Sequence, residues 1–210
     1  PLSNQQILYR PPAYISQDSA LTERIELYID GTTQVLWGQK ASLSFEFVTD
    51  EGASAVVQKE ILVFRPPVRM VHGYLGSTET WTSMENYLGV NKFMSSSSDY
   101  RAAIELMAMD LKADILRMME GYDGNGFRVG KVDIVSHSMG GLIASLYGNE
   151  TYLNSLSTIG TPYFGSPWAD ILWSTVDEAD SSLFEGSIAE MIRIAAGSAT
   201  EGAIEDLRVN

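Results

Sequence analysis

The spacing of hydrophobic residues along the chain changes near residue 65. Before that point, Ile25, Leu27 and Ile29 alternate with polar or amphipathic residues, which is typical of a half-buried strand. Further extended runs are predicted at residues 34–37, 43–47 and 55–64. Residues 1–65 are therefore predicted to be a β-rich region. It is either part of a sandwich-like domain or an antiparallel lead into the next sheet, and we favour the first.

After Arg65-Pro66-Pro67, short apolar runs alternate with stretches of helical period. The pattern predicts strands at residues 68–71, 92–97, 132–135 and 153–159. Thr78 is the expected cap of a helix that ends at Leu88, and Asp99 is the expected cap of a long helix. The apolar stripe of that long helix contains Ile104, Met107, Ala108, Leu111, Ile115, Met118 and Met119. Strands that alternate with helices predict an α/β domain over residues 66–210, with a parallel sheet covered on both faces.

Composition and charge exclude several classes of protein. The 210 residues are 45% hydrophobic, so the chain can bury a core. A net charge of −13 argues against nucleic acid as a partner. No apolar run reaches the roughly 18–20 residues of a transmembrane segment. The absence of cysteine rules out a disulfide framework. Because the chain opens at Pro1 and not at a methionine, we expect it to be a processed or excised piece.

One serine lies where a predicted strand changes directly into a predicted helix. The stretch Ser136-His137-Ser138-Met139-Gly140 has small residues two positions before and two positions after Ser138. A sharp strand–turn–helix needs such small residues, and it exposes the serine hydroxyl at its apex. The backbone N–H of Met139 would then be a donor for an oxyanion that forms at Ser138, at the favourable N-terminus of a helix.

Two further stretches accompany this serine in a fixed order. His72-Gly73 follows the strand at 68–71, and the loop Gly160–Pro167 follows the strand at 153–159. Over roughly residues 66–175 the trio resembles the α/β-hydrolase superfamily, and within it bacterial lipases and esterases. The resemblance implies that Ser138 is the nucleophile, that the N–H of Tyr74 is the second oxyanion donor, and that no cofactor is needed.

The sequence departs from that family because a catalytic base and acid are missing. The chain has two histidines, and neither follows Ser138. We expect His72 to shape the oxyanion loop, and His137 to be packed and hydrogen-bonded beneath the sheet. Asp170 is interpreted as a surface or capping residue. A later acidic cluster, which is a solvated surface run or a weaker cation-site candidate, consists of Asp177, Glu178 and Asp180.

Two interpretations of the missing groups remain. We favour a truncated or cleaved hydrolase whose Asp and His lie on a C-terminal part, which would be a complementary partner chain if cleavage is natural. The alternative is a catalytically silent hydrolase fold used for binding. Residues 168–206 are rich in large apolar side chains and form either a cap over the serine or helices packed on the sheet.

The function predicted from the sequence is therefore hydrolysis of apolar carboxylic esters, with an acyltransferase or amidase as alternatives on the same fold. The chain alone is expected to be inactive because it lacks the base. By analogy with enzymes that carry a β-domain before a lipase-like domain, we expect a secreted bacterial protein.

Overall fold

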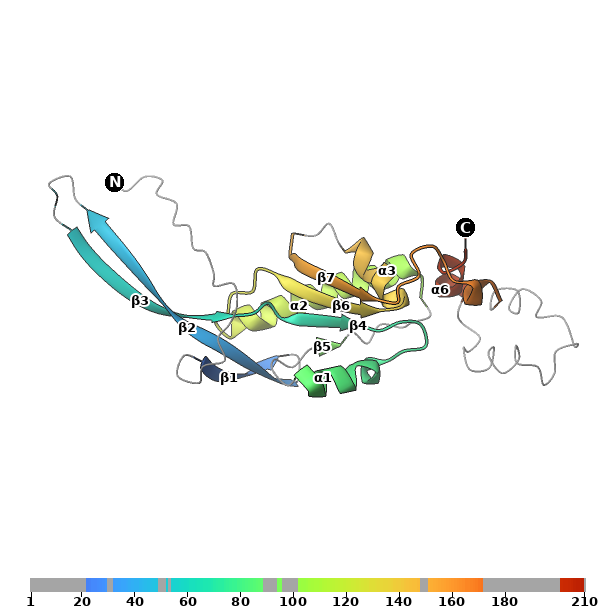
Figure 1. Ribbon diagram of the computed structural model, residues 1–210, viewed down its shortest axis with the longest axis horizontal. Coiled ribbons are helices and arrows are strands. Elements are labelled where there is room, and N and C mark those ends of the chain that lie inside the picture. Colours follow the sequence, from blue (N-terminus) through green and yellow to red (C-terminus); the bar gives the residue numbers. More distant parts are fainter. Residues whose placement is uncertain are drawn as a thin grey trace, which may run out of the picture. The chain divides into compact units, whose positions relative to one another are not determined.

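The computed structural model describes residues 22–29, 32–48, 52, 54–88, 94–95, 102–147, 151–171 and 201–209. The chain divides into two compact units. One comprises residues 1–28 and 33–65, and the other comprises residues 29–32 and 66–210. A three-stranded sheet belongs to the β-rich N-terminal part, and a four-stranded sheet with helices belongs to the second unit (Figure 1). Whether residues 1–65 form a sandwich-like domain stays a prediction.

In the N-terminal sheet, one continuous strand, β2, takes the place of two strands that the sequence predicted. Its strands are β1 (Thr22–Ile29), β2 (Thr32–Val48) and β3 (Ser54–Phe64), in the order β1-β2-β3. β2 runs without a break through both predicted runs and pairs antiparallel with β3 from Gly38 to Val48. Gly38 is not a turn residue. It is buried, and a Cβ there would lie 2.7 Å from the ring of Phe64, so the missing side chain makes room for the partner strand.

The second unit confirms the predicted fold class, an α/β-hydrolase-like parallel sheet with helices on both faces. Its strands are β4 (Val68–Val71), β5 (Met94–Ser95), β6 (Val132–His137) and β7 (Leu153–Ile159). They lie in the order β5-β4-β6-β7, and all neighbours are parallel.

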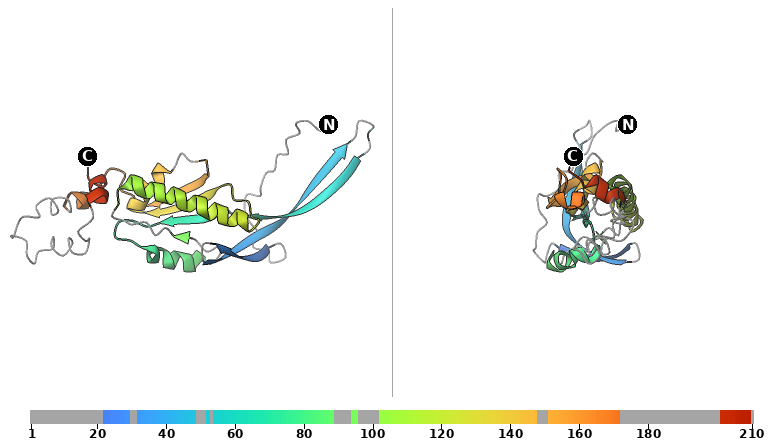
Figure 2. Two further views of the ribbon diagram at one scale, coloured as in Figure 1. Left: turned by 180° about the vertical axis from the view of Figure 1, so that it is seen from behind. Right: turned by 90° about the vertical axis from the view of Figure 1, so that its right-hand side faces the viewer.

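The strand order decides which face each helix covers. The chain steps from β4 to β5 in one direction, then back across β4 to β6 and on to β7. Because such crossovers are right-handed, the helix α1 (Thr82–Leu88) lies on one face, and the helices α2 (Ile104–Gly124) and α3 (Met139–Leu146) lie on the other. Figures 1 and 2 show α2 along one face of the sheet and α1 next to β5.

The first helical segment begins one residue earlier than predicted. Ser77, not Thr78, is the cap of a 3-10 turn, η1 (Thr78–Trp81), which leads directly into α1. The Ser77 side chain accepts a hydrogen bond from the N–H of Glu79 at 3.3 Å, and the Thr80 hydroxyl accepts one from the N–H of Ser77 at 3.3 Å. This reciprocal arrangement is a capping box, and it fixes the end of the loop that follows β4.

α2 begins at Ile104, and no side chain next to it in sequence caps its N-terminus. Ala103 occupies the cap position and makes no side-chain bond, and Asp99 lies outside the described residues. The Ile104 N–H donates instead to the Asp206 carboxylate at 2.8 Å. Asp206 is the last residue of α6 (Glu201–Asp206), so a segment about 100 residues later in the sequence supplies the cap.

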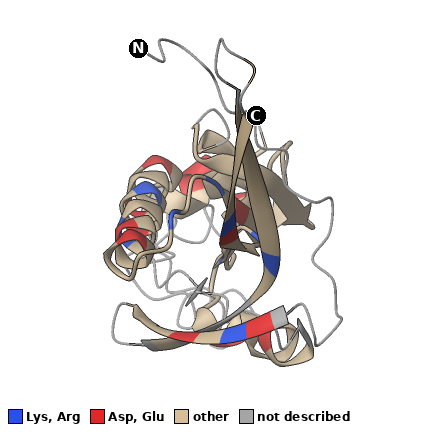
Figure 3. Ribbon diagram, turned by 90° about the vertical axis from the view of Figure 1, so that its left-hand side faces the viewer, with Lys and Arg blue, Asp and Glu red and all other residues tan. Residues whose placement is uncertain are grey.

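The apolar stripe predicted for α2 packs into the core. Ile104, Met107, Leu111, Ile115 and Met118 are buried, and Ala108 and Met119 are partly exposed. Tyr122, which the pattern left out, is also buried, and its burial raises the pKa of the phenol to about 12. Acidic and basic residues are interspersed along the rest of the helix (Figure 3). Among the described helices, none combines the length and the hydrophobicity needed to cross a bilayer.

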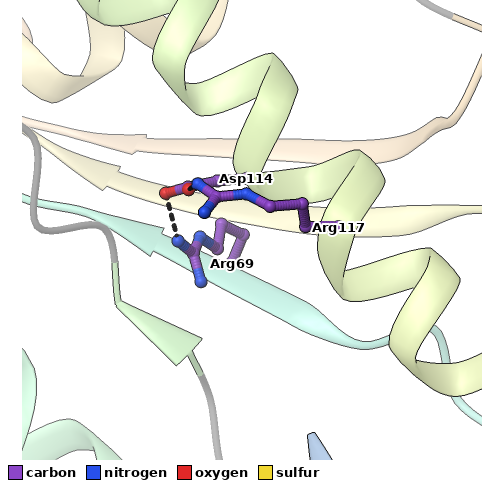
Figure 4. A network of polar contacts seen from close by, with 3 residues as sticks. All are labelled: Arg69, Asp114 and Arg117. Carbon is purple, nitrogen blue, oxygen red and sulfur yellow. Dashed lines mark hydrogen bonds and ion pairs between the residues drawn. The ribbon is translucent and has the colours of Figure 1, made fainter. Parts of the chain in front are cut away.

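A buried ion pair joins the sheet to α2. The Arg69 side chain of β4 is 6% exposed, and its Nη2 lies 2.5 Å from Oδ2 of Asp114, whose other oxygen binds the exposed Arg117 (Figure 4). Arg69 pairs in register with Ile134, so Ile134 lies on the same face as α2. By the alternation of a strand, Val132 and Ser136 share that face, and His137 lies on the opposite one.

Candidate active site

The candidate site lies at the carboxyl ends of β4 and β6. The chain leaves β4 for β5 on one side and returns to β6 on the other, so the strand order reverses at β4. In open parallel sheets, ligands bind outside the carboxyl ends of the strands at such a point. The loop that begins with His72 follows β4, and Ser138 follows β6, so the first two sequence stretches meet here.

Ser138 has a strained backbone conformation. Its φ is 53° and its ψ is −129°, a region that residues with a side chain rarely adopt. Such a conformation costs about 1–3 kcal/mol and persists only where the surroundings impose it. The Ser138 N–H donates to the carbonyl of Ile159 at 2.8 Å, and the Ser138 carbonyl accepts from the N–H of Gly141 at 2.9 Å. These bonds attach the turn to β7 and to the first turn of α3.

The glycines after Ser138 are needed where other segments approach α3. A Cβ on Gly140 would lie 2.5 Å from the carbonyl oxygens of Val71 and His72. A Cβ on Gly141 would collide with the side chain of Thr161. These glycines therefore allow the helix to lie close to the end of β4 and to the loop after β7.

The loop after β4 folds back on itself beside Ser138. A Cβ on Gly73 would lie 3.2 Å from the Ser138 Oγ, so the loop backbone closely approaches the serine. The Gly73 carbonyl accepts the N–H of Gly76 at 3.0 Å, which closes a turn over residues 73–76. Leu75 occupies the third position of this turn with a φ of 57°. That position normally takes glycine or asparagine.

His72 contacts the same carbonyl that closes the turn. Its side chain is buried, and its Nδ1 lies 2.9 Å from the Gly73 oxygen, so the tautomer protonated at Nδ1 donates to it. A trans peptide directs its C=O and its N–H to opposite sides. Two donors on the Gly73 oxygen therefore orient the N–H of Tyr74, the predicted second oxyanion donor. The position of His72 agrees with the expectation that it shapes this loop.

Met139 is the first residue of α3. An N–H in the first turn of a helix has no acceptor within that helix. The Met139 N–H therefore has no acceptor within α3, and it directly follows Ser138 in the sequence. The roles of Ser138, Met139 and Tyr74 in catalysis stay predictions, and the structure adds the close approach of the Gly73 backbone to Ser138.

The expectation for His137 is wrong. It was predicted to be packed and hydrogen-bonded beneath the sheet, but its side chain is exposed on the face of β6 opposite α2. Its ring makes no hydrogen bond to a described residue. The small residue before it, Ser136, is the buried one, and its hydroxyl donates to the carbonyl of Ser157 at 3.3 Å. Within the described part of the chain, neither histidine is hydrogen-bonded to the Ser138 Oγ.

The loop after β7 supplies aromatic groups and no carboxylate. The Tyr163 hydroxyl lies 3.1 Å from the Ser145 hydroxyl, and this contact joins the loop to α3. The Ser145 hydroxyl donates to the carbonyl of Gly141 within the same helix. Asp170 pairs with Arg208 at 3.5 Å and is partly exposed, as expected of a surface residue. Residues 177, 178 and 180 lie outside the described residues. Within the described ranges, no cluster of three or more His, Cys, Asp or Glu could hold a metal ion.

Exposed large apolar side chains occur in the loop after β4, in the loop after β7 and in the helical residues 167–171 that follow it. They are Leu75, Tyr163, Phe164, Trp168 and Ile171. Most of the predicted cap, residues 172–200, lies outside the described residues. The segments before and after residues 172–200 contact each other. The Ser166 N–H donates to the carbonyl of Leu207 at 2.7 Å, and Asp170 pairs with Arg208.

The sequence did not identify two features of this site. One is Leu75, although the glycines at 73 and 76 are spaced as in a four-residue turn and could have suggested it. The other is the Thr161 side chain, which fills the space that Gly141 leaves. No local signal in the sequence indicates that contact.

No protein-family model and no curated protein matches the chain. Solved structures with some similarity include N-formylmaleamic acid deformylase from Pseudomonas putida, with 16% identity, a TM-score of 0.41 and coverage of 90% of this chain and 75% of that one. An α/β hydrolase from a Medee basin deep-sea metagenome library has 12% identity, a TM-score of 0.44 and coverage of 88% and 72%. A hydrolase from Pseudomonas aeruginosa has 12% identity, a TM-score of 0.41 and coverage of 88% and 73%.

These likenesses assign neither an activity nor a residue role to this chain. The strand order β5-β4-β6-β7, the crossovers on both faces and the strained turn at Ser138 are observations on the chain itself. On those observations, the second unit has an α/β-hydrolase-like fold with a serine at its switch point.

Proposed function

We propose that this chain carries the nucleophile and the oxyanion hole of a serine hydrolase that acts on carboxylic esters, of the lipase or esterase type. The observation that carries the proposal is the geometry at Ser138. A serine with a φ of 53° starts a helix, and a glycine backbone approaches its hydroxyl so closely that a Cβ would lie 3.2 Å away. Strain of this kind at a turn between strand and helix is typical of catalytic nucleophiles.

The chemistry requires a base at the Ser138 hydroxyl. The Oγ forms a bond to the ester carbonyl carbon, its proton passes to the base, and the carbonyl oxygen becomes an oxyanion that the N–H groups of Met139 and Tyr74 would stabilise. The C–O bond to the alcohol then breaks, and the alcohol leaves with the proton. Water releases the acid from the acyl-enzyme in the same way. Each oxyanion donor contributes about 3 kcal/mol.

A second polypeptide segment is proposed to supply the base and its acid. The chain has two histidines, one engaged with the Gly73 carbonyl and one exposed on the face opposite α2. In the four-stranded sheet, β7 is an edge strand, and most of its side chains are exposed. A parallel strand paired with β7 would bring further residues to the carboxyl edge, where Ser138 lies. The catalytic Asp and His are proposed to lie on such a strand.

Exposed apolar side chains on the segments that follow β4 and β7 support an apolar substrate. Phe164 is 93% exposed, Trp168 is 61% exposed, and Leu75 is 49% exposed. Exposed apolar groups on the segments that follow β4 and β7 favour acyl or alkyl chains over charged substrates. The net charge of −13 opposes the binding of anionic substrates.

Labelling with a fluorophosphonate probe tests the proposal. The Ser138 Oγ would displace fluoride from phosphorus, and the base would take the hydroxyl proton. We expect the native protein to be labelled at Ser138, the Ser138→Ala variant to remain folded and unlabelled, and the 210-residue chain alone to react slowly. Intact-mass measurement of the native protein checks the partner segment. A mass near 23 kDa with no associated chain contradicts that part of the proposal.

The second candidate is a hydrolase fold that binds without catalysis. The missing base is the observation that favours it. The same labelling experiment separates the two functions, because a binding protein leaves Ser138 unmodified in the native protein as well as in the isolated chain. An acyltransferase would be labelled like a hydrolase, and it would be distinguished by transfer of the acyl group to an alcohol in preference to water.

A further inference from the structure

Leu75 combines a costly backbone conformation with an exposed side chain. Its φ is 57°, and of the described residues other than glycine it shares a positive φ with Ser138 alone. For a residue with a Cβ, the left-handed region is disfavoured, and a glycine would adopt it without strain. The side chain is 49% exposed, so burial in the core does not account for a leucine at this position.

The position of Leu75 relates it to the serine. It is the third residue of the turn closed by the Gly76 N–H and the Gly73 carbonyl, and Gly73 is the residue whose backbone faces the Ser138 Oγ. Leu75 also directly follows Tyr74, whose N–H is the predicted second donor. An exposed side chain at this position therefore belongs to the same short turn as Gly73, whose backbone approaches Ser138.

We infer that Leu75 is a specificity-determining residue, whose side chain contacts the acyl or alkyl chain of the substrate next to the oxyanion hole. The inference rests on the proposed ester hydrolase function, and it names the loop after β4 as one wall of the chain-binding surface. The leucine is kept in a strained turn because its apolar surface is used when substrate is bound. Short substrates do not reach it.

Three variants separate strain from contact. Leu75→Gly removes both the strain and the side chain, and Leu75→Ala removes the side chain and keeps the strain. Leu146→Ala is the matched control, because Leu146 is 57% exposed at the far end of α3. The readouts are the melting temperature and the rates at which ethyl and dodecyl phosphonofluoridates label Ser138 in the native protein.

We expect both Leu75 variants to lower the ratio of dodecyl to ethyl labelling rates about fivefold, equivalent to about 1 kcal/mol. Leu75→Gly should also melt higher than Leu75→Ala. The Leu146 control should leave the ratio unchanged. An unchanged ratio in both Leu75 variants, or a Leu75→Gly protein that melts lower than Leu75→Ala, overturns the inference and leaves the proposed function standing. If the parent protein reacts with neither probe, the proposed function fails and the inference falls with it.

Discussion

The carboxylate of Asp206 accepts the first N–H of α2, that of Ile104, at 2.8 Å. The two residues lie 102 positions apart, so the cap of the longest described helix comes from the last one. Around this bond, Ala203, Ile204 and Leu207 are buried. The contact therefore holds α6 against the N-terminus of α2 and, through Leu207, against the loop after β7.

Removing this cap should destabilise the second unit. In the variant Asp206→Ala, the Ile104 N–H loses its acceptor, and we expect a loss of about 1 kcal/mol in the free energy of unfolding, measured in urea. Glu205→Ala is the control, because Glu205 is an exposed neighbour on α6. Equal stabilities of the two variants would show that the bond contributes nothing.

Gly140 should tolerate no side chain. A Cβ there would lie 2.5 Å from two backbone oxygens, which cannot rotate away, so Gly140→Ala must displace α3 from the end of β4. We expect a loss of more than 2 kcal/mol in unfolding free energy and loss of fluorophosphonate labelling of the native protein.

The matched control for this substitution is Gly124→Ala, at the end of α2. Nothing lies within 4 Å of its Cβ position, so the variant should be as stable as the parent or up to about 1 kcal/mol more stable. A Gly140→Ala protein with the stability and labelling of the Gly124 variant would contradict the packing described for α3.

Removing one partner of the ion pair between Arg69 and Asp114 should strongly lower the stability of the fold. Asp114→Ala leaves the buried Arg69 guanidinium without its carboxylate, and we expect a loss of about 3 kcal/mol in unfolding free energy. Arg117→Ala removes the exposed partner of the same aspartate, and it should cost less than about 1 kcal/mol. The double variant Arg69→Met with Asp114→Leu should recover part of the loss, and stability no better than that of Asp114→Ala would argue against an electrostatic cause.

Stability should fall in alkali because of Tyr122. Burial raises the pKa of its phenol to about 12 in the folded protein, against about 10 in the unfolded chain. This contribution is fully present below pH 10 and is lost as the pH rises from 10 through 12, because the unfolded chain ionises first. In Tyr122→Phe the decline between pH 10 and pH 12 should be shallower, as measured by urea unfolding at several pH values. Parallel declines in the variant and the parent would contradict the assignment to Tyr122.

The features that follow from local patterns were predictable from the sequence. The apolar stripe of α2 and the strands β4 and β7 follow from the spacing of hydrophobic residues. The turn at Ser138 follows from its small neighbours and from the change from strand to helix. These predictions depend on interactions between residues close in sequence, and such interactions leave a periodic signal.

The features that the sequence did not reveal depend on contacts between distant segments. A glycine such as Gly38 usually indicates the end of a strand. Only the close approach of Phe64 explains why it lies within a continuous strand here. The cap of α2 comes from α6, so no search near Ile104 could find it. The exposure of His137 depends on what covers that face of β6, which the alternation of residues within the strand does not specify.

The two strained turns also limit how stable this fold can be. Leu75 and Ser138 both have a positive φ, and glycine at either position would recover about 1–3 kcal/mol. The fold therefore carries two local costs in stability on neighbouring loops, and the same backbone would be more stable with glycine at both positions.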